Sequence, residues 1–446
     1  MSSTFRQSNL SPQARADQAL REILTLQWKQ EPGLIIQSPP GGGKTGIVER
    51  VAIQELALLH GRAMIATLTN EQTFDLARRL TAHYPRYPIY LFVRADLPVA
   101  QDLLTIANLV IVRNSTQLPK GPCVILANAQ RWLYDSYDDH FTCLILDEAY
   151  QLPYSRFLPL ASMADRLVLV GDPGQIGPVI TCNIDRWKSE PAGPHLPCPQ
   201  ALFAQHAPFK VLGLPVSRRL VPDTVAIIQP VFYPRLPFLA LTSPGTRGIV
   251  VSSARSTVFD QAIDLAVGGA SMVQIELPPL MTGHSDEELA DRMVALIQTL
   301  FSRGLHVRDD GGSVIPLRSS MIGVVCAHVR QVSAVVKRLP SQSGILVETA
   351  DRFQGLERHI MIVHHPLSGQ ASIDDFHLDV GRLCTMLSRH RILCFLLTRQ
   401  GIDEMLKTSP LSGDRILGSQ EDREYFGWKA HLHIQRNIGK YVVRIK

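Results

Sequence analysis

The residues from Ser38 to Thr45 read Ser-Pro-Pro-Gly-Gly-Gly-Lys-Thr, and they lie between a short apolar run and a helical pattern. Consecutive glycines let backbone N–H groups turn inward on a phosphate, and the following helix adds the positive end of its dipole. Lys44 is then expected to reach the β- and γ-phosphates of a nucleotide, and the Thr45 hydroxyl to coordinate Mg²⁺. Ser38 stands where such loops usually carry their first glycine. The predicted nucleotide contacts come from Pro40, Gly41, Gly42, Gly43, Lys44 and Thr45.

A second pair of candidate residues follows the apolar run Leu144–Leu146, which ends in Asp147 and Glu148. A strand that ends at the carboxyl edge of a parallel sheet places such side chains where ligands bind in α/β folds. Asp147 is expected to hold the Mg²⁺ shell, and Glu148 to orient and polarise the attacking water. The two segments together predict a P-loop domain that hydrolyses ATP with Mg²⁺ as its metal cofactor.

The elements that must position these residues alternate between short apolar runs and helical patterns along the whole chain. Helices are expected at about 45–60, 73–83 and 286–301, the last opened by a capping box of Ser285 and Glu288. Strands are predicted at 34–36, 63–67, 124–126, 144–146, 167–170, 248–251, 273–277, 322–326, 345–347, 360–363 and 392–397. A Pro-rich stretch at about 185–210 interrupts the pattern. The alternation predicts two successive α/β lobes with parallel sheets buried on both faces.

Composition describes an ordinary globular chain with one unusual segment. The 446 residues include 45 Lys and Arg and 40 Asp and Glu, which gives a net charge of +5. Residues 425–446 carry five of these bases and no acid, so the rest of the chain is neutral. This distribution excludes a uniformly basic coat for nucleic acid, but not a local basic surface. The lack of a membrane-spanning apolar run or signal-peptide core predicts a soluble intracellular protein without a membrane partner.

Further segments resemble the motifs of superfamily 1 helicases. Residues 147–151 resemble their DEAxQ box, and residues 171–178, Gly-Asp-Pro-Gly-Gln-Ile-Gly-Pro, resemble their third motif. Residues 349–357 resemble the fifth motif, and residues 379–391 resemble the sixth. With the phosphate loop, these motifs follow the family's order over most of the chain. The resemblance implies two tandem RecA-like P-loop lobes with the ATP site in the cleft between them.

The same resemblance implies a division of the chain and a branch of the superfamily. It predicts an N-terminal lobe at 1–213, a C-terminal lobe at 214–400 and a basic, aromatic extension at 401–446. The segments Arg218–Pro222 and Phe353–Glu357 resemble the branch of the nonsense-mediated-decay RNA helicase and its DNA-acting relatives. That branch generally translocates 5′ to 3′ on single strands. Residues 67–70, Thr-Leu-Thr-Asn, also resemble the UvrD-type branch, which moves in the opposite direction.

The resemblance assigns catalytic roles to three more residues. Gln175 is expected to sense the γ-phosphate from the first lobe, whereas Arg219 and Arg389 act as arginine fingers from the second. Charge that develops during phosphoryl transfer must be neutralised in place, so hydrolysis requires the lobes to close on ATP. A solvated or salt-bridged arginine is the usual alternative for an isolated Arg. The surrounding motifs favour the catalytic interpretation.

Two further nucleotide contacts are implied on the adenosine side. Glu357, which follows Gly355, is expected to contact the ribose. Gln18 is expected to read the adenine, and Gln13 is the alternative, because the distance along the chain to Lys44 is longer than usual.

Single-stranded DNA or RNA is the partner that the resemblance implies. Thr67, Thr69, Asn70 and Asn128 are expected to contact the backbone from the first lobe, and Thr349 from the second. Hydroxyl and amide donors suit this role because they bind phosphate without reading a base. Thr69 and Asn70 also stand where a helix needs an N-cap, and the two roles are compatible. Since no inserted domain is evident between Asn70 and Asp147, a partner protein for loading is also expected.

Two segments of the sequence allow more than one interpretation. Residues 425–446 combine aromatic and basic side chains, and 431–434 and 441–445 partly alternate like strands. They predict either an additional nucleic-acid surface or an edge strand with a charged outer side. Cys182, His195, Cys198 and His206 form a loose group whose spacing matches no standard zinc pattern, so an irregular surface segment is preferred over a metal site.

The sequence therefore predicts an ATP-dependent helicase or translocase that moves on single strands, 5′ to 3′. The alternative is an ATP-dependent nucleic-acid clamp, or a switch module regulated by a partner, with little unwinding of its own.

Overall fold

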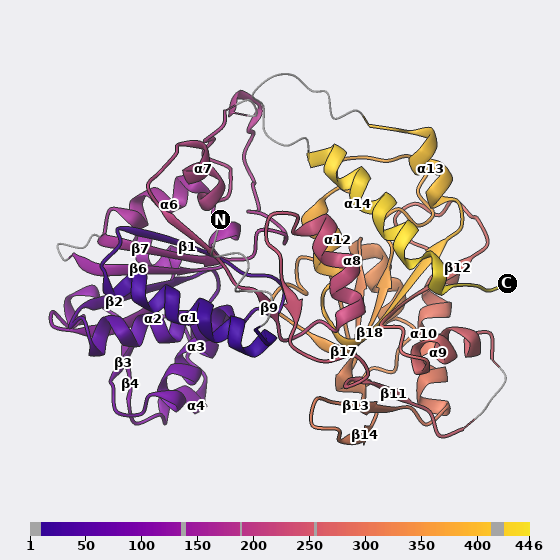
Figure 1. The fold of residues 1–446 in the computed structure, drawn as a ribbon, viewed down its shortest axis with the longest axis horizontal. Coiled ribbons are helices and arrows are strands. Elements are labelled where there is room, and N and C mark those ends of the chain that lie inside the picture. Colours follow the sequence, from indigo (N-terminus) through magenta and orange to yellow (C-terminus); the bar gives the residue numbers. More distant parts are fainter. Residues whose placement is uncertain (1–9, 135–139, 188–189, 254–256, 412–422) are drawn as a thin grey trace. The chain divides into compact units, whose positions relative to one another are not determined.

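The computed structural model describes residues 10–134, 140–187, 190–253, 257–411 and 423–446 (Figure 1). The chain forms two compact units. The first comprises residues 1–173 and 177–215, and the second comprises residues 174–176 and 216–446. The short segment at 174–176 therefore packs with the second unit, although its neighbours in the chain belong to the first. Each unit is described below by itself.

The first unit is built on a sheet whose strands all pair in parallel. The spatial order in this eight-stranded sheet is β4-β3-β5-β2-β6-β7-β1-β8. The strands are β1 Gly33–Gln37, β2 Arg62–Thr67, β3 Ile89–Phe92, β4 Leu109–Val112, β5 Cys123–Asn128, β6 Phe141–Asp147, β7 Ala164–Gly171 and β8 Lys210–Gly213. The phosphate loop follows β1 and the Asp-Glu pair ends β6. Both therefore lie at the carboxyl edge of one sheet, as predicted.

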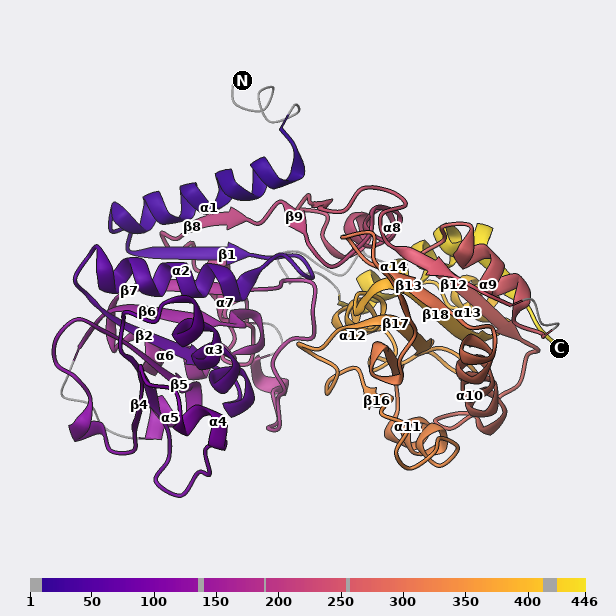
Figure 2. The ribbon, with the colours of Figure 1, turned by 90° about the horizontal axis from the view of Figure 1, so that it is seen from below.

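Helices cover both faces of this sheet (Figure 2). They are α1 Pro12–Trp28, α2 Lys44–Ala57, α3 Asn70–His83, α4 Gln101–Leu104, α5 Ala129–Tyr134, α6 Tyr154–Ala161 and α7 Cys198–Ala204. Leu34 and Ile36 pack with α1, α2 and α3, whereas Ile35 between them packs with α5, α6 and α7. This alternation follows from the pleat of the strand, and it explains why β1 is apolar throughout.

The second unit has its own parallel sheet, in the order β16-β15-β17-β18-β12-β19. Its strands are β12 Met272–Leu277, β15 Ile322–Cys326, β16 Leu346–Thr349, β17 Arg358–His364, β18 His390–Arg399 and β19 Val442–Arg444. Its helices are α8 Pro222–Phe232, α9 Asp260–Val267, α10 Glu287–Ser302, α11 Val329–Val336, α12 Val380–Leu387, α13 Ile402–Thr408 and α14 Arg423–Ile438. Helices α9, α10 and α11 pack on one face, and α8, α12 and α14 pack on the other. The prediction of two α/β lobes with parallel sheets is confirmed.

Short elements complete the two units. The strands β9 Val216–Ser217 and β10 Leu239–Ala240 form a parallel pair, and β11 Gly248–Val250, β13 His306–Arg308 and β14 Val314–Pro316 form an antiparallel sheet. Single 3₁₀ turns lie at η1 Ser115–Gln117, η2 Ala149–Gln151, η3 Asp185–Trp187, η4 Ser319–Met321 and η5 Gly439–Tyr441.

The C-terminal segment corrects one prediction and supports another. The predicted strand at 431–434 is wrong, because these residues lie in α14. Ala430, Ile434 and Ile438 are buried at the four-residue spacing of a helix, against α8 and α12. The expected edge strand is present as β19, which pairs in parallel with β12. The segment is thus part of the second unit's fold, and only its outward side is available as a charged surface.

The start of α10 also differs from prediction. The N-cap is Asp286, whose carboxylate accepts a hydrogen bond from the Leu289 N–H at 2.9 Å, and the capping box of Ser285 and Glu288 is absent. Asp286 holds this position because its carboxylate is also paired with Arg399, a contact that local sequence does not reveal.

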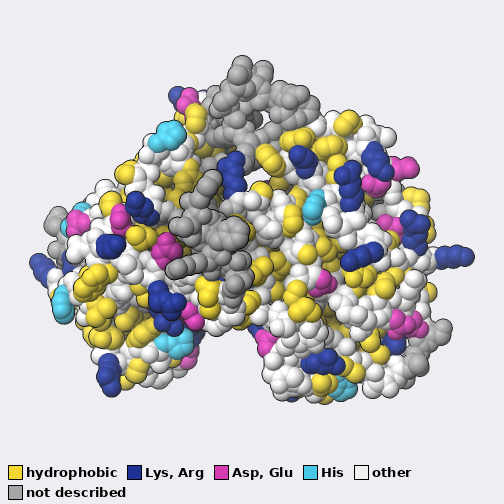
Figure 3. Space-filling view, in the orientation of Figure 1, with side chains coloured by type: hydrophobic (Ala, Val, Ile, Leu, Met, Phe, Trp, Pro, Cys, Tyr) yellow, Lys and Arg dark blue, Asp and Glu magenta, His cyan; other side chains and the backbone are white. Residues whose placement is uncertain are grey.

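Surface charge is mixed on both units. On the face drawn in Figure 3, basic and acidic side chains are interspersed, in agreement with the neutral composition of residues before 425. Among the described residues, no helix is both long and apolar enough to cross a membrane.

Candidate functional site

The loop between β1 and α2 has the backbone conformation that a phosphate cradle requires. Gly41 and Gly43 have φ angles of 69° and 91°, in the left-handed region that favours glycine. A Cβ atom added to Gly42 would lie 2.4 Å from the Ser38 Oγ. Ser38 is buried and donates to the Pro39 carbonyl at 3.0 Å, so the residue that departs from the usual pattern braces the loop from inside. Gly43 supplies no side-chain cap to α2, so the helix start presents its backbone N–H groups.

Lys44, in the first turn of α2, is paired with the acid predicted to orient water. Its Nζ atom lies 2.7 Å from Oε2 and 2.6 Å from Oε1 of Glu148. Glu148 is buried and has a φ of 59°, a left-handed conformation that is strained for a residue with a Cβ. Such strain persists only where the surroundings impose it, and here it aims the carboxylate of Glu148 at the lysine beside the phosphate loop.

Asp147 lies next to this pair at the end of β6. The backbone N–H of Glu148 donates to Asp147 Oδ1 at 3.0 Å. Burial and the adjacent charge of Glu148 raise the pKa of Asp147, although Lys44 opposes the shift. A buried carboxyl group beside a second carboxylate is a suitable environment for a divalent cation. The chemistry of this donor set, with the Thr45 hydroxyl one residue after Lys44, fits Mg²⁺ bound with a nucleotide.

The second unit brings together two residues of separate helicase-like motifs. Arg389 Nη2 donates to Gln175 Oε1 at 2.7 Å, and both side chains are buried. The backbone of Gln175 also lies against α12, since a Cβ added to Gly381 would be 2.6 Å from the Gln175 carbonyl oxygen. Gln175 was expected to act from the first lobe; instead, residues 174–176 pack with the second unit. The predicted γ-phosphate sensor and one predicted arginine finger are therefore in direct contact.

A separate cluster surrounds the predicted ribose contact. Arg219 Nε donates to Glu357 Oε2 at 2.6 Å, and Arg391 Nη1 donates to Glu357 Oε1 at 2.9 Å. Burial opposes ionisation of Glu357, but the two guanidinium groups hold the pKa of its carboxyl below the usual range. Gly355, two residues earlier, has a φ of 83° and allows the turn that presents Glu357. Arg391 was not predicted as a site residue, although it lies within the sixth motif.

The predicted strand contacts of the first unit lie together at the ends of neighbouring strands. Thr67 of β2 and Asn128 of β5 are register partners, and Asn128 Nδ2 donates to Asn70 Oδ1 at 2.5 Å. Thr69 caps α3 in a capping box with Gln72, as its position predicted. Thr67 is completely buried and its hydroxyl forms a hydrogen bond with Thr73, so it lies beneath the other predicted strand contacts. The exposed Thr69 and the half-buried Asn70 and Asn128 remain accessible to a backbone.

The structure gives the positions of three other predicted residues, Thr349, Gln18 and Gln13, without testing their roles. Thr349 ends β16 and is half-buried. Gln18 and Gln13 are exposed on α1, where Gln13 donates to Asp17 at 2.7 Å. Helix α1 is tied to α2 by a hydrogen bond of 2.8 Å from Gln27 to the Val51 carbonyl. An adenine contact from α1 stays a prediction.

The cysteine and histidine group does not form a metal site within the described part of the chain. Cys198 is buried at the start of α7, and its thiol lies 3.2 Å from the Ala149 carbonyl oxygen. Burial raises the pKa of this thiol well above the usual range, which disfavours the thiolate that zinc requires. Cys182 is exposed on the surface.

Comparison with known proteins gives one family match and several matches to proteins named as helicases. Residues 282–400 match a family described as an AAA domain. The fission yeast Schizosaccharomyces pombe protein named DNA replication ATP-dependent helicase/nuclease dna2 is 22% identical over 280 residues, which are 57% of this chain and 18% of that protein.

This chain thus spans about a fifth of the length of that curated protein. Two solved helicases resemble it more distantly. The arterivirus nonstructural protein 10 helicase, solved with DNA, has a TM-score of 0.44 and 14% identity, with 88% of this chain and 65% of that chain covered. Pif1, solved at forked double-stranded DNA, has a TM-score of 0.37 and 13% identity, with 85% of this chain and 91% of that chain covered. None of these matches selects the nonsense-mediated-decay branch.

Proposed function

We propose that this protein is an ATP-driven motor on single-stranded nucleic acid, in which two lobes close on ATP and reopen after hydrolysis. The observation that carries the proposal is the contact of Lys44 with Glu148 beside Asp147, at the end of a glycine loop built for phosphate. A P-loop lysine, a metal-binding acid and a water-orienting acid are the groups that phosphoryl transfer to water requires.

In this mechanism, bound Mg²⁺ would neutralise the charge on the β- and γ-phosphate oxygens, held by Thr45 and Asp147. Lys44 would leave Glu148 and bind those oxygens, which are stronger acceptors for a cation than one carboxylate. Glu148, released from its ion pair, would then accept a hydrogen bond from the attacking water. The present ion pair therefore keeps Glu148 occupied until a nucleotide takes its lysine. This exchange would couple nucleotide binding to formation of the base.

The second unit would complete the reaction. Arg219 and Arg389 are proposed as arginine fingers, Gln175 as the γ-phosphate sensor and Glu357 as the ribose contact. Arg389 and Gln175 already form one hydrogen-bonded unit, so they would move to the phosphates together. The lobes would correspond to 1–213 and 214–400, with 401–446 attached to the second. Because closure would depend on ATP, each hydrolysis cycle would alter the grip on the strand.

Single-stranded DNA is the substrate proposed first, because the curated relative is named as a DNA replication helicase/nuclease. Thr69, Asn70 and Asn128 would hold the backbone from the first unit, and Thr349 from the second. These donors bind phosphate without demanding a base, so RNA binding is tested beside DNA. Movement from 5′ to 3′ is proposed from the motif resemblance.

A clamp or switch that depends on a partner protein is the second candidate function. Between Asn70 and Asp147, the described residues form only elements of the first unit's own sheet and its helices, with no inserted domain in the described ranges. Helicases that separate strands often need a further surface that splits the duplex. A partner that loads the motor or supplies that surface would then be required.

A strand-displacement assay separates the two candidates. Duplexes with a single-stranded 5′ or 3′ overhang, in DNA and RNA, are mixed with the wild-type protein and with Lys44→Ala, which cannot use ATP. We expect ATP-dependent displacement of the 5′-overhang substrate by the wild type alone. Displacement from the 3′ overhang would reverse the proposed direction. ATP hydrolysis that is stimulated by single strands without any displacement would select the clamp.

A further inference from the structure

Four planar side chains from separate segments of the second unit form a continuous stack. The ring centroids of His284 and His328 are 4.3 Å apart with their planes tilted by 33°, and those of His328 and Phe376 are 4.8 Å apart with an angle of 19° between their planes. The Arg382 guanidinium covers the other side of Phe376, 3.8 Å from its centroid. In this arrangement, His328 and Phe376 each contact two planar neighbours.

The stack ends in an exposed ring. His328 is half-buried between its two neighbours, whereas His284 is exposed and has a ring partner on one side only in the described part of the chain. Met281, three residues before His284, and Val329, directly after His328, are 71% and 70% exposed, which is unusual for apolar side chains of this size. The exposed ring of His284 therefore continues the line of rings, and apolar side chains nearby in the chain are also exposed.

The stack lies near the edge of the sheet where a strand contact was predicted. His328 follows β15 by two residues, and Cys326 at the end of β15 is the register partner of Thr349. At the other end of the stack, Arg382 lies 3.8 Å from Asp351, two residues after Thr349. The stack and the fifth-motif loop are therefore neighbours on one carboxyl edge, where ligands bind in parallel sheets.

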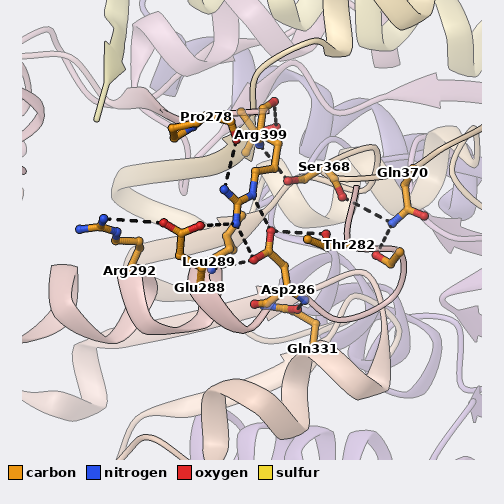
Figure 4. A network of polar contacts seen from close by, with 12 residues as sticks. Pro278, Thr282, Asp286, Glu288, Leu289, Arg292, Gln331, Ser368, Gln370 and Arg399 are labelled. Atoms are coloured by element: carbon orange, nitrogen blue, oxygen red, sulfur yellow. Dashed lines mark hydrogen bonds and ion pairs between the residues drawn. The ribbon is translucent and has the colours of Figure 1, made fainter. Parts of the chain in front are cut away.

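Thr282 and Asp286, which lie on either side of His284 in the chain, belong to one network of polar contacts (Figure 4). Before it, the backbone N–H groups of Thr282 and Gly283 donate to the Gly369 carbonyl at 2.9 and 3.0 Å. After it, Asp286 is locked by the buried Arg399, with contacts of 2.7 and 2.8 Å. A rigid ring loses little entropy when a ligand stacks on it, so the geometry favours a binding surface.

The same network joins His284 to the helix that follows His328. The Gln331 side chain, in α11, accepts from the Asp286 N–H at 2.6 Å and donates to the Asp286 carbonyl at 3.1 Å. This pair of bonds fixes the segment of His284 against α11. Burial and the nearby His284 and His377 lower the pKa of His328 to about 4, so its ring is neutral at pH 7 and does not repel its partners.

We propose that the exposed face of His284 stacks on one base of the single strand, while the donors around Thr349 hold its backbone. This inference rests on the proposed function, because it names a further contact for the same strand. Stacking on a ring tolerates any base, since every base has a π-face, and it suits a motor that must bind without regard to sequence. Arg330 and Arg352, both exposed beside the stack and the loop, would add favourable charge for the phosphates.

The test compares His284→Ala with His284→Phe, which keeps an aromatic face. Binding of a fluorescent oligo(dT) and of an abasic strand of equal length, which has the backbone without bases, is measured by anisotropy. We expect His284→Ala to weaken oligo(dT) binding by about tenfold, as loss of one stacked base implies. His284→Phe should bind oligo(dT) as the wild type does. The abasic strand should bind the wild type and both variants equally.

Phe301→Ala is the matched control, because Phe301 is an exposed aromatic residue at the opposite end of α10. It should bind both strands as the wild type does. Equal oligo(dT) affinity of His284→Ala and wild type would overturn the stacking proposal alone, as would an equal loss on both strands. Failure of the wild type to bind any single strand would overturn the proposed function as well.

Discussion

Lys44 and Glu148 are joined by an ion pair in which the lysine Nζ contacts both carboxylate oxygens, at 2.6 and 2.7 Å. The two residues are 104 positions apart, and the pair brings the phosphate loop and the end of β6 together. Glu148 adopts its strained left-handed backbone at this contact. The pair is thus the point at which nucleotide binding and activation of water would meet.

Lys44→Ala is expected to abolish ATP hydrolysis. The change removes the cation that would neutralise the phosphates. It also leaves the adjacent acids Glu148 and Asp147 without a neighbouring lysine. Loss of one such group commonly costs about 10²–10³ in kcat. Steady-state hydrolysis and binding of a fluorescent nucleotide measure the effect, and both should fall. Arg50→Ala, which removes an exposed cation from the same helix, should behave as the wild type; a Lys44→Ala protein with normal hydrolysis would disprove the assigned site.

Glu148→Gln separates binding from chemistry at the same pair. The amide keeps the size of the side chain and can still accept a hydrogen bond from Lys44, but it cannot take a proton from water. Nucleotide affinity should therefore remain, whereas hydrolysis should fall by at least about 10²-fold. A loss of affinity equal to that of Lys44→Ala would show that Glu148 acts only on the nucleotide.

Arg389→Lys tests the contact of Arg389 with Gln175. Lysine keeps the charge but lacks the planar fork that donates from fixed positions. We expect hydrolysis to fall by about tenfold or more, with the thermal midpoint nearly unchanged because the buried charge is preserved. Arg318→Lys, at an exposed arginine of the same unit, should leave the hydrolysis rate unaltered. Equal rates in both variants and the wild type would remove Arg389 from the catalytic set.

The Asp286–Arg399 ion pair is predicted to stabilise the second unit. Both side chains are almost completely buried, and the two contacts are 2.7 and 2.8 Å. Asp286→Ala would leave a buried cation with only the partly exposed Glu288, so the free energy of unfolding should fall by about 3–5 kcal/mol. Glu288→Gln, at the exposed end of the same network, should cost less than about 1 kcal/mol. Urea unfolding of the two variants checks the difference, and similar losses would contradict it.

Buried histidines predict a loss of stability in mild acid. Burial lowers the pKa of His364 and His431 to about 4 and of His390 to about 3. The unfolded chain takes up protons below about pH 6.5, whereas the folded chain does not, so stability falls as pH drops from 6.5 toward 4. Each histidine contributes about 1.4 kcal/mol per pH unit in that range.

The change in urea midpoint between pH 7.5 and pH 5.5 measures this effect. His431→Gln should reduce the change, because the amide can donate to the His377 carbonyl in place of the ring without titrating. An identical pH dependence in His431→Gln and the wild type would show that His431 is not one of the titrating groups.

Local patterns predicted the phosphate loop and most strands of both sheets, but not β3, β4 or β8 of the first unit, because the predicted features depend on residues close in sequence. Gly41, Gly43 and Thr69 each have the conformation or cap that their residue type favours. Contacts between distant segments were not predictable in this way. The N-cap at Asp286 is set by Arg399 from another strand, and no local signal distinguished it from Ser285.

The C-terminal segment shows a different limit. Its short alternation at 431–434 favoured a strand, but the four-residue spacing of Ala430, Ile434 and Ile438 was the stronger signal over a longer window. The pairing of Arg391 with Glu357 could not be predicted either. Arg391 is one of several arginines in the sixth motif, and no local feature of the sequence distinguishes it.

The rate of ATP hydrolysis with and without single-stranded DNA or RNA is the most direct test of the central claim. We predict slow hydrolysis by the protein alone, a severalfold faster rate with saturating single strands, and no hydrolysis above background by Lys44→Ala under either condition. Equal wild-type rates with and without single strands of either kind would contradict a nucleic-acid motor.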